Sequence, residues 1–169
     1  YASGFEVTTG LVSRLGFDPV GKDGVKLSER WADGAHTLHG VLTHGFPNLL
    51  ICHFVQAGFG LNFTHYLSQS TNHIASIIAA AKDQNITSIE ATEEAEEAWL
   101  ATLWEAGKGF GRYAAKCTPS YGNSEGARSM EAARNIVHPG NLMNYVAYLE
   151  EWRDAGDMPG TVVVSAEDA

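Results

Sequence analysis

The sequence contains few cysteines, few positive charges and no long apolar run, and each shortage excludes a class of protein. Its two cysteines, Cys52 and Cys117, provide neither a disulfide framework nor the spacing of a zinc site. The formal net charge of −9 at pH 7 argues against a nucleic-acid surface, which needs a basic face. No stretch approaches the roughly 20 apolar residues of a membrane span, and no signal-peptide pattern is present. We therefore expect a cytoplasmic protein without nucleic-acid or membrane partners.

Motifs that would let this chain catalyse a reaction by itself are also missing. A nucleophilic enzyme needs a positioned Ser or Cys beside a His, but no Gly-x-Ser-x-Gly sequence occurs. Cys117 lies in an irregular segment without a helix terminus to activate it. Cys52 lies in the apolar run 48–54, and we expect it to be a buried thiol.

Histidines and glutamates are the remaining candidates for a metal or acid–base site. The seven histidines are His36, His39, His44, His53, His65, His73 and His138. The first three fall on a strand-like segment where neighbouring side chains alternate faces, and no carboxylate partner is nearby, so we expect no metal site. A group of glutamates is expected to form a solvated helix face rather than an acid–base pair. These are Glu93, Glu94, Glu96 and Glu97.

Hydrophobic periodicity predicts three main helices. The first begins after the capping residue Asn62 and ends near Asn85. Its expected inward face consists of Phe63, Tyr66, Leu67, Ser70, Ile74, Ile77, Ile78 and Ala81. The second begins at Thr92, with acidic residues in its first turn, and is expected to end at Gly107 and Gly109. The third spans 141–155. Its expected inward face is Leu142, Tyr145, Val146, Leu149 and Trp152.

Short strands and irregular segments account for the rest of the chain. Strand-like runs occupy 37–43, 48–54 and 161–165. A short helix is expected over 27–31, capped by Ser28 or the residues before it, and 107–140 is expected to wrap over another part of the protein. The pattern predicts an α+β fold that is mainly helical.

One local pattern suggests a binding site. In 48–78 a buried strand is followed by a glycine-rich turn and then by a helix N-terminus, whose free N–H groups suit polarised oxygens or a phosphate. An ordinary strand-to-helix connection that binds nothing explains the same pattern equally well. Spacing alone does not name a ligand.

Several stretches, in the same order along the chain, resemble the Baeyer–Villiger monooxygenases, which insert oxygen beside a ketone carbonyl. The stretch Tyr-Ala-Ser-Gly-Phe at 1–5 is similar to the family's Ala-Thr-Gly-Phe, and His-Gly-Phe-Pro-Asn-Leu at 44–49 is similar to its Gly-Phe-Pro-Asn-Leu. Further similarity lies at 23–25, 31–34, 37–41, 62–73, 90–92, 94–96, 117–121, 123–126 and 152–156. The later motifs most resemble the branch acting on aryl ketones such as hydroxyacetophenone and on larger ketones.

This resemblance implies that the chain is the carboxyl-terminal part of a flavoprotein with two Rossmann-like dinucleotide-binding domains. Residues 1–61 would supply strands and turns that reach the flavin, and 62–169 would supply the helical part. The family uses FAD and NADPH. The cofactor-binding residues implied are Ser3, Gly4, Gln56, Ala57, Gly58, Phe59 and Asn62. The implied substrate-binding residues are Phe59, Phe63 and Tyr66.

The chain departs from the family pattern mainly by absence. No Gly-x-Gly-x-x-Gly sequence for either cofactor is present, and no arginine here occupies the place of the family's catalytic arginine. No catalytic residue is therefore assigned to this chain. His53-Phe54 replaces a small turn, so Phe54 is expected to crowd the flavin. We expect a piece of a longer protein, inactive alone and dependent on an amino-terminal part or a companion chain.

Two alternatives remain open. The chain could be a non-catalytic helical interaction module that self-associates through an exposed apolar face. It could also be part of a related flavin monooxygenase that oxidises nitrogen or hydroxylates its substrate.

Overall fold

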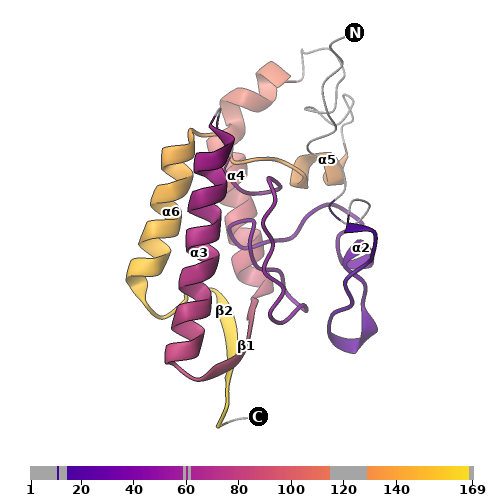
Figure 1. Cartoon of the computed structure of the whole chain (residues 1–169). Helices are drawn as coiled ribbons and strands as arrows, with labels where there is room; N and C mark the ends of the chain where they lie inside the picture. The colour runs from indigo at the N-terminus through magenta and orange to yellow at the C-terminus, as the bar shows by residue number, and fades with distance from the viewer. Residues whose placement is uncertain (1–10, 12–14, 59, 61, 115–128, 168–169) are drawn as a thin grey trace.

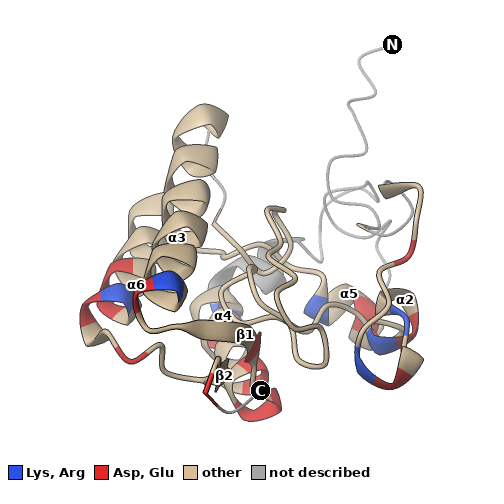
Figure 2. Cartoon of the chain, turned by 60° about the horizontal axis from the view of Figure 1, so that its bottom comes forward, with Lys and Arg blue, Asp and Glu red and all other residues tan. Residues whose placement is uncertain are grey.

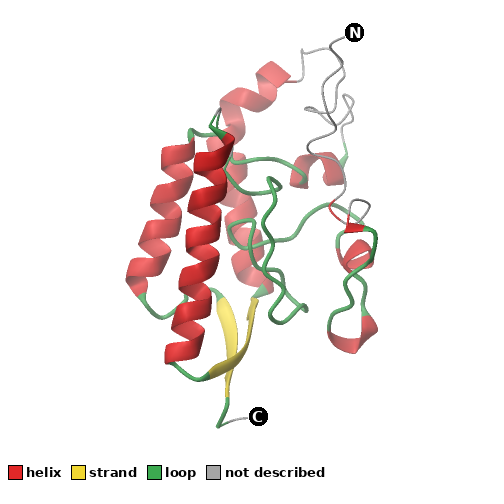
Figure 3. Cartoon of the chain, viewed as in Figure 1, coloured by secondary structure: helices red, strands yellow, loops and turns green. Residues whose placement is uncertain are grey.

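The computed structural model describes residues 11, 15–58, 60, 62–114 and 129–167. Three long helices, α3 (Phe63–Asp83), α4 (Glu93–Ala114) and α6 (Leu142–Ala155), pack beside one another. A two-stranded sheet lies at one end of them, and the irregular chain before α3 covers one side (Figure 1). Coloured by secondary structure, the molecule is helical apart from that sheet and long connecting loops (Figure 3). The predicted α+β, mainly helical fold is confirmed.

Helix α3 begins and ends where the sequence predicts. The Asn62 side chain caps it by accepting a hydrogen bond from the His65 N–H at 3.1 Å. The chain turns away at Asn85, which has a positive φ of 54°. The inward face is narrower than expected, because Phe63 and Ile78 are 49% and 53% exposed. The buried positions are Tyr66, Ser70, His73 and Ile77.

Helix α4 begins after Thr92, whose hydroxyl oxygen accepts a hydrogen bond from the Ala95 N–H at 3.1 Å. The prediction that it ends at Gly107 and Gly109 is wrong, since the helix continues to Ala114. Glycine inside a helix costs only about 1 kcal/mol, which a long helix can tolerate. At Gly107 the missing side chain also leaves room for Pro139, whose Cγ lies 3.3 Å from the place a Cβ would take.

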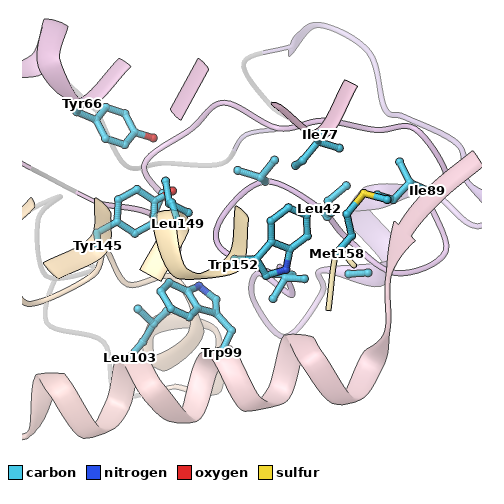
Figure 4. Close-up of a cluster of buried hydrophobic side chains, with 14 residues drawn as sticks. Leu42, Tyr66, Ile77, Ile89, Trp99, Leu103, Tyr145, Leu149, Trp152 and Met158 are labelled. Atoms are coloured by element: carbon cyan, nitrogen blue, oxygen red, sulfur yellow. The ribbon is translucent and has the colours of Figure 1, made fainter. Parts of the chain in front are cut away.

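Helix α6 lies where the sequence predicts, and it has a cap at each end. The Asn141 side chain accepts from the Asn144 N–H at 3.0 Å, and Gly156 follows the helix with a φ of 76°. Its inward face is confirmed by the burial of Tyr145, Val146, Leu149 and Trp152. Figure 4 shows Tyr145, Leu149 and Trp152 meeting Trp99 and Leu103 of α4 in the main hydrophobic core.

The two strands close the far end of this core. Strand β1 (Ile86–Ala91) pairs in antiparallel register with β2 (Thr161–Ser165), with Ile89 opposite Val163. The prediction of β2 is confirmed. Strand β1 was missed, although its Ile-Thr-Ser-Ile run has strand propensity.

The predicted strands at 37–43 and 48–54 are wrong. Residues 37–43 form a tight turn held by an isolated bridge between Leu38 and Leu42, with His39 and Gly40 at φ values of 56° and 72°. A Cβ at Gly40 would lie 2.6 Å from that of Ala57, so the turn depends on glycine there. Apolar composition alone did not distinguish a buried loop from a buried strand.

The loops also contain short helical turns. These are η1 (Lys22–Gly24), α2 (Leu27–Arg30) and α5 (Met130–Arg134). The predicted helix near 27–31 is confirmed, but Lys26 precedes it as the cap, and Ser28 instead hydrogen-bonds the Asp18 carboxylate. Cys52, expected to be buried, is exposed. In the described part of the chain, no helix is long and apolar enough to cross a membrane.

Candidate functional site

The turn before α3 is built around Gln56, a completely buried glutamine with a left-handed backbone. Its side-chain oxygen accepts from the N–H and the hydroxyl of Thr37, at 3.0 and 2.7 Å. Its side-chain nitrogen donates to the carbonyls of Ala35 and Arg134, at 2.6 and 3.1 Å. All four hydrogen-bonding positions of the carboxamide are therefore occupied within the chain.

The backbone of this turn is held equally firmly. The Gln56 N–H donates to the Ile136 carbonyl at 2.6 Å, and the Gln56 carbonyl accepts from Trp99 Nε1 at 2.8 Å. The Ala57 carbonyl accepts from the His138 N–H at 2.8 Å. Residues 134–138 thus run across the turn and hold it against α4.

Packing fixes the next residues. Gly58 is buried, and a Cβ on it would lie 2.3 Å from Cδ1 of Tyr145. A Cβ on Gly60 would lie 3.2 Å from Cδ2 of Leu142. Both glycines let the chain pass close over the start of α6. Phe59 and Leu61 lie outside the described residues.

The N-terminus of α3 follows directly. Asn62 is exposed, and its side-chain oxygen accepts from the His65 N–H and from the Thr64 hydroxyl, the latter at 2.8 Å. Among the described residues, no acceptor meets the N–H groups of Phe63 and Thr64. From Phe63 to Ala81 the helix contains no Lys, Arg, Asp or Glu, and its turns are tan in Figure 2.

Three aromatic rings lie together at this end of α3. The Phe54 ring stacks on Tyr66 at a centroid distance of 5.0 Å and lies 5.3 Å from Phe63. Tyr66 is buried, and its hydroxyl donates to the His53 carbonyl at 2.6 Å. Burial raises the pKa of Tyr66 to about 12, so the phenol stays protonated at neutral pH. Phe63 forms the half-exposed edge of the cluster.

Two buried glutamates, Glu96 and Glu90, hold the loop that contains His44 and Gly45. Glu96 is 1% exposed and accepts from the His44 N–H and from Arg30, both at 2.7 Å. Glu90 is also buried, accepts from the Gly45 N–H at 2.7 Å and pairs with Lys22. The expectation of a solvated glutamate face is therefore wrong for Glu96. Helical spacing did not reveal that a loop supplies its partners.

A second charged cluster anchors residues 134–138. Arg134 is 7% exposed, and its guanidinium donates to Glu97 at 2.8 Å and to Nδ1 of His36 at 3.1 Å. Nε2 of His36 meets Asp33 at 2.8 Å, and this bond lowers the pKa of the Asp33 carboxyl. Because Nδ1 accepts from Arg134, the His36 proton belongs on Nε2.

Buried histidines line the aromatic core instead of a metal site. His39 and His73 lie 5.9 Å apart, each with an edge toward Trp152. Desolvation lowers the pKa of His39 to about 4 and that of His73 to about 3. Both are neutral at physiological pH. Within the described ranges, no three His, Cys, Asp or Glu side chains gather to hold a metal ion.

The structure thus brings together most of the residues that the resemblance implied. Gln56, Ala57, Gly58, Asn62, Phe63 and Tyr66 lie in one continuous stretch around the start of α3. Ser3, Gly4 and Phe59 lie outside the described residues. The residues that sequence reasoning missed are those that hold the turn from a distance, namely Thr37, Trp99 and Arg134.

The curated proteins to which this chain is similar include several monooxygenases. Pentalenolactone D synthase from Streptomyces arenae is 37% identical over 162 residues, covering 95% of this chain and 28% of that protein. The FAD-binding monooxygenase hmp7 from Hypomyces subiculosus is 35% identical over 95% of this chain and 27% of its own length. Baeyer–Villiger monooxygenase 4 from Dietzia sp. is 31% identical over 100% of this chain and 28% of its own length. No protein-family model matches.

Solved structures agree. A polycyclic ketone monooxygenase from Thermothelomyces thermophila matches with a TM-score of 0.81 and 33% identity, over 92% of this chain and 25% of that one. A cyclohexanone monooxygenase from Rhodococcus sp. Phi1, bound to NADP+, matches with a TM-score of 0.77 and 26% identity, over 98% and 30%. The chain spans about 28% of the curated relatives it matches. It corresponds in sequence and fold to the carboxyl-terminal part of a Baeyer–Villiger-type monooxygenase.

Proposed function

We propose that this chain forms one wall of the flavin and substrate site of an enzyme that uses FAD and NADPH to convert ketones to esters or lactones. The proposal rests on one observation: 37% identity over 95% of the chain to a relative of which it spans 28%. These 169 residues contain no Gly-x-Gly-x-x-Gly sequence for a cofactor phosphate, so we expect no activity from them alone.

The residues present fit such a wall. The turn 56–58 is buried and held by its own chain, so it would fix the position of the exposed start of α3 rather than touch the ring itself. The N–H groups of Phe63 and Thr64 have no acceptor among the described residues, and a helix N-terminus favours an electron-rich edge. FAD, when bound, supplies the oxygen chemistry, and these residues would orient it and exclude water.

The proposed role of each residue depends on how exposed its side chain is and on the bonds that it already makes. Gln56, Ala57 and Gly58 would contribute backbone shape, and Asn62 would keep the helix N-terminus in place. Phe63 presents half of its ring and is the better candidate for a ketone contact. Tyr66 would support Phe54 and Phe63 from behind. Ser3, Gly4 and Phe59 are proposed on the resemblance alone, as is the division into 1–61 and 62–169.

For the substrate we propose an aryl or larger ketone. The motif at 117–121, Cys-Thr-Pro-Ser-Tyr, resembles that branch, and the similar structure from Thermothelomyces thermophila is named a polycyclic ketone monooxygenase. The flat cluster of Phe54, Phe63 and Tyr66 suits a ring-bearing molecule.

The test compares a complete enzyme carrying this segment with the segment alone. We expect the complete enzyme to show flavin absorbance and ketone-dependent NADPH oxidation with ester or lactone formation. The segment alone should show neither. NADPH-dependent ketone oxidation by the purified 169 residues would refute the proposal. Products oxidised only at nitrogen or carrying a new hydroxyl would assign the related monooxygenase class.

A further inference from the structure

The buried position of Gln56 points to a role different from cofactor contact. We propose that Gln56 is a positioning residue, which sets the backbone of the turn 56–58 by joining it to two distant segments of the chain. This inference rests on the proposed flavin wall for its functional meaning. The geometry that supports it lies wholly within the described residues.

The side chain of Gln56 has no hydrogen-bonding position left for a cofactor. The carboxamide has two acceptor positions and two donor hydrogens. Thr37 fills both acceptor positions, and the carbonyls of Ala35 and Arg134 take both donors. A bond from this side chain to a cofactor would break one of these bonds in a site with no access to water, leaving a buried polar group unpaired.

The backbone of Gln56 has a left-handed conformation, with a φ of 55°. A residue that carries a Cβ enters this region at a cost of about 1 kcal/mol or more. Such a conformation persists only where surrounding contacts fix it. Here the Ile136 carbonyl, Trp99 Nε1 and the four side-chain bonds supply those contacts.

The bonds at this place require the length and the carboxamide group of glutamine. A glutamate in this place would lose both donors and bring a carboxylate against the Ala35 and Arg134 carbonyls. An asparagine is one methylene shorter and would not span the same segments. Only a glutamine combines this reach with donors on one side and acceptors on the other, which matches a hub that joins residues 35–37 to 134–136.

Further hydrogen bonds connect the partners of Gln56 to neighbouring residues. The Thr37 hydroxyl oxygen also accepts from the Gly40 N–H at 3.0 Å, and the Ala57 carbonyl accepts from the His138 N–H. Loosening the Thr37–Gln56 pair should therefore loosen the turn 56–58 and residues 134–138 together.

The test removes one hydroxyl with minimal change of shape. In a complete enzyme carrying this segment, Thr37→Val deletes the hydroxyl and Thr37→Ser keeps it. Thr71→Val makes the same chemical change on the exposed side of α3, where the hydroxyl bonds only its own helix. The readouts are amide hydrogen exchange of peptides covering 54–58 and 134–138, the dissociation constant for FAD, and the NADPH consumed per molecule of product.

We expect Thr37→Val to speed exchange in both peptides about tenfold, equivalent to about 1.4 kcal/mol of lost protection. It should also weaken FAD binding several-fold and raise the NADPH consumed without product. Thr37→Ser keeps the hydroxyl and should leave all three readouts close to those of the unsubstituted enzyme. Thr71→Val should change none of the three readouts. A purely structural loss would lower the amount of folded enzyme without altering the ratio of NADPH to product.

Three results would overturn the inference. The first is unchanged exchange in both peptides. The second is faster exchange with unchanged FAD affinity and coupling, which would separate the turn from the flavin. The third is equal damage from Val and Ser, which would remove the hydroxyl as the cause. Failure of the unsubstituted enzyme to bind FAD would refute the proposed function instead, and the exchange measurement would still decide whether Thr37 and Gln56 hold the turn.

Discussion

The helical part of this chain and its irregular part are held together in different ways. In α3, α4 and α6, apolar side chains at helical spacing meet in one core, and local caps such as Asn62 and Asn141 define the ends. Residues 15–58 are also held by buried polar side chains. Gln56 of this segment, Glu90 of β1 and Glu96 of α4 bind backbone groups that lie far away in sequence. Damage to the helical part should therefore cost packing energy, and damage to the irregular part should leave polar groups unpaired.

The largest loss should come from the helical core. Leu103 of α4 is completely buried in the core that α4 forms with α6. Leu103→Ala removes most of its side chain and leaves a cavity. We expect a loss of about 2–5 kcal/mol in the free energy of unfolding. Urea denaturation measures it, with the exposed Thr71→Ala as the control expected to change stability by about 0.5 kcal/mol or less. A loss below about 1 kcal/mol would mean that this core is not tightly packed.

A loss of a different kind and of smaller size should follow from Glu96→Ala, because this change leaves polar groups unpaired instead of removing packing. The substitution leaves the His44 N–H and the Arg30 guanidinium without their acceptor, which should cost about 2–3 kcal/mol. Glu94 is exposed and lies two residues earlier on the same helix. Glu94→Ala should therefore cost about 0.5 kcal/mol. Equal effects of the two substitutions would refute the buried role of Glu96.

Acid should destabilise the protein through its buried histidines. The pKa values of His39 and His73 are lowered to about 4 and about 3 in the folded state, against 6.5 unfolded. Their contribution to stability is complete above pH 6.5 and is lost as the pH falls toward 4, by about 2 kcal/mol each at pH 5. The raised pKa of Glu96 acts in the opposite direction, because its protonated form is favoured by folding.

Urea unfolding at pH 7.5 and pH 5 tests this linkage. The double variant His39→Asn with His73→Gln should lose most of the difference between the two pH values, since neither new side chain titrates. An unchanged difference in the double variant would assign the acid sensitivity to other groups.

The smallest effect should come from the helix cap next to the proposed site. Asn62→Ala removes the acceptor for the His65 N–H and should cost about 1 kcal/mol. Asn62→Asp keeps an acceptor and should retain most of the stability. Thermal unfolding measures both, with Asn141→Ala at the start of α6 as a comparable cap. If Asn62→Asp and Asn62→Ala lower stability equally, the capping account is wrong.

The sequence predicted the helical part well for a local reason. The boundaries of α3 and α6 and the strand β2 follow from caps, periodicity and propensity within a few residues of each element. It failed at Gly107 and Gly109, because a glycine costs a long helix only about 1 kcal/mol and does not by itself end it. It failed again at 37–43 and 48–54, because apolar runs there serve a buried loop.

The position of the candidate site along the chain could be predicted from the sequence, but the contacts that hold it could not. The glycine-rich turn and Asn62 indicated where the chain enters α3, and the resemblance named the flavin. The partners of the Gln56 side chain are 19 to 78 positions away, and no local pattern marks them. The burial of Glu96 was hidden for the same reason, because its acceptor role depends on a loop about 50 residues earlier.

The central claim is that the start of α3, positioned by the buried turn 56–58, lies against FAD. Amide hydrogen exchange of a complete enzyme carrying this segment, measured with and without FAD, tests it most directly. The account predicts that FAD slows exchange in peptides covering 54–66 and leaves the β1–β2 sheet unchanged. Protection confined to other peptides, with no change in 54–66, would contradict it.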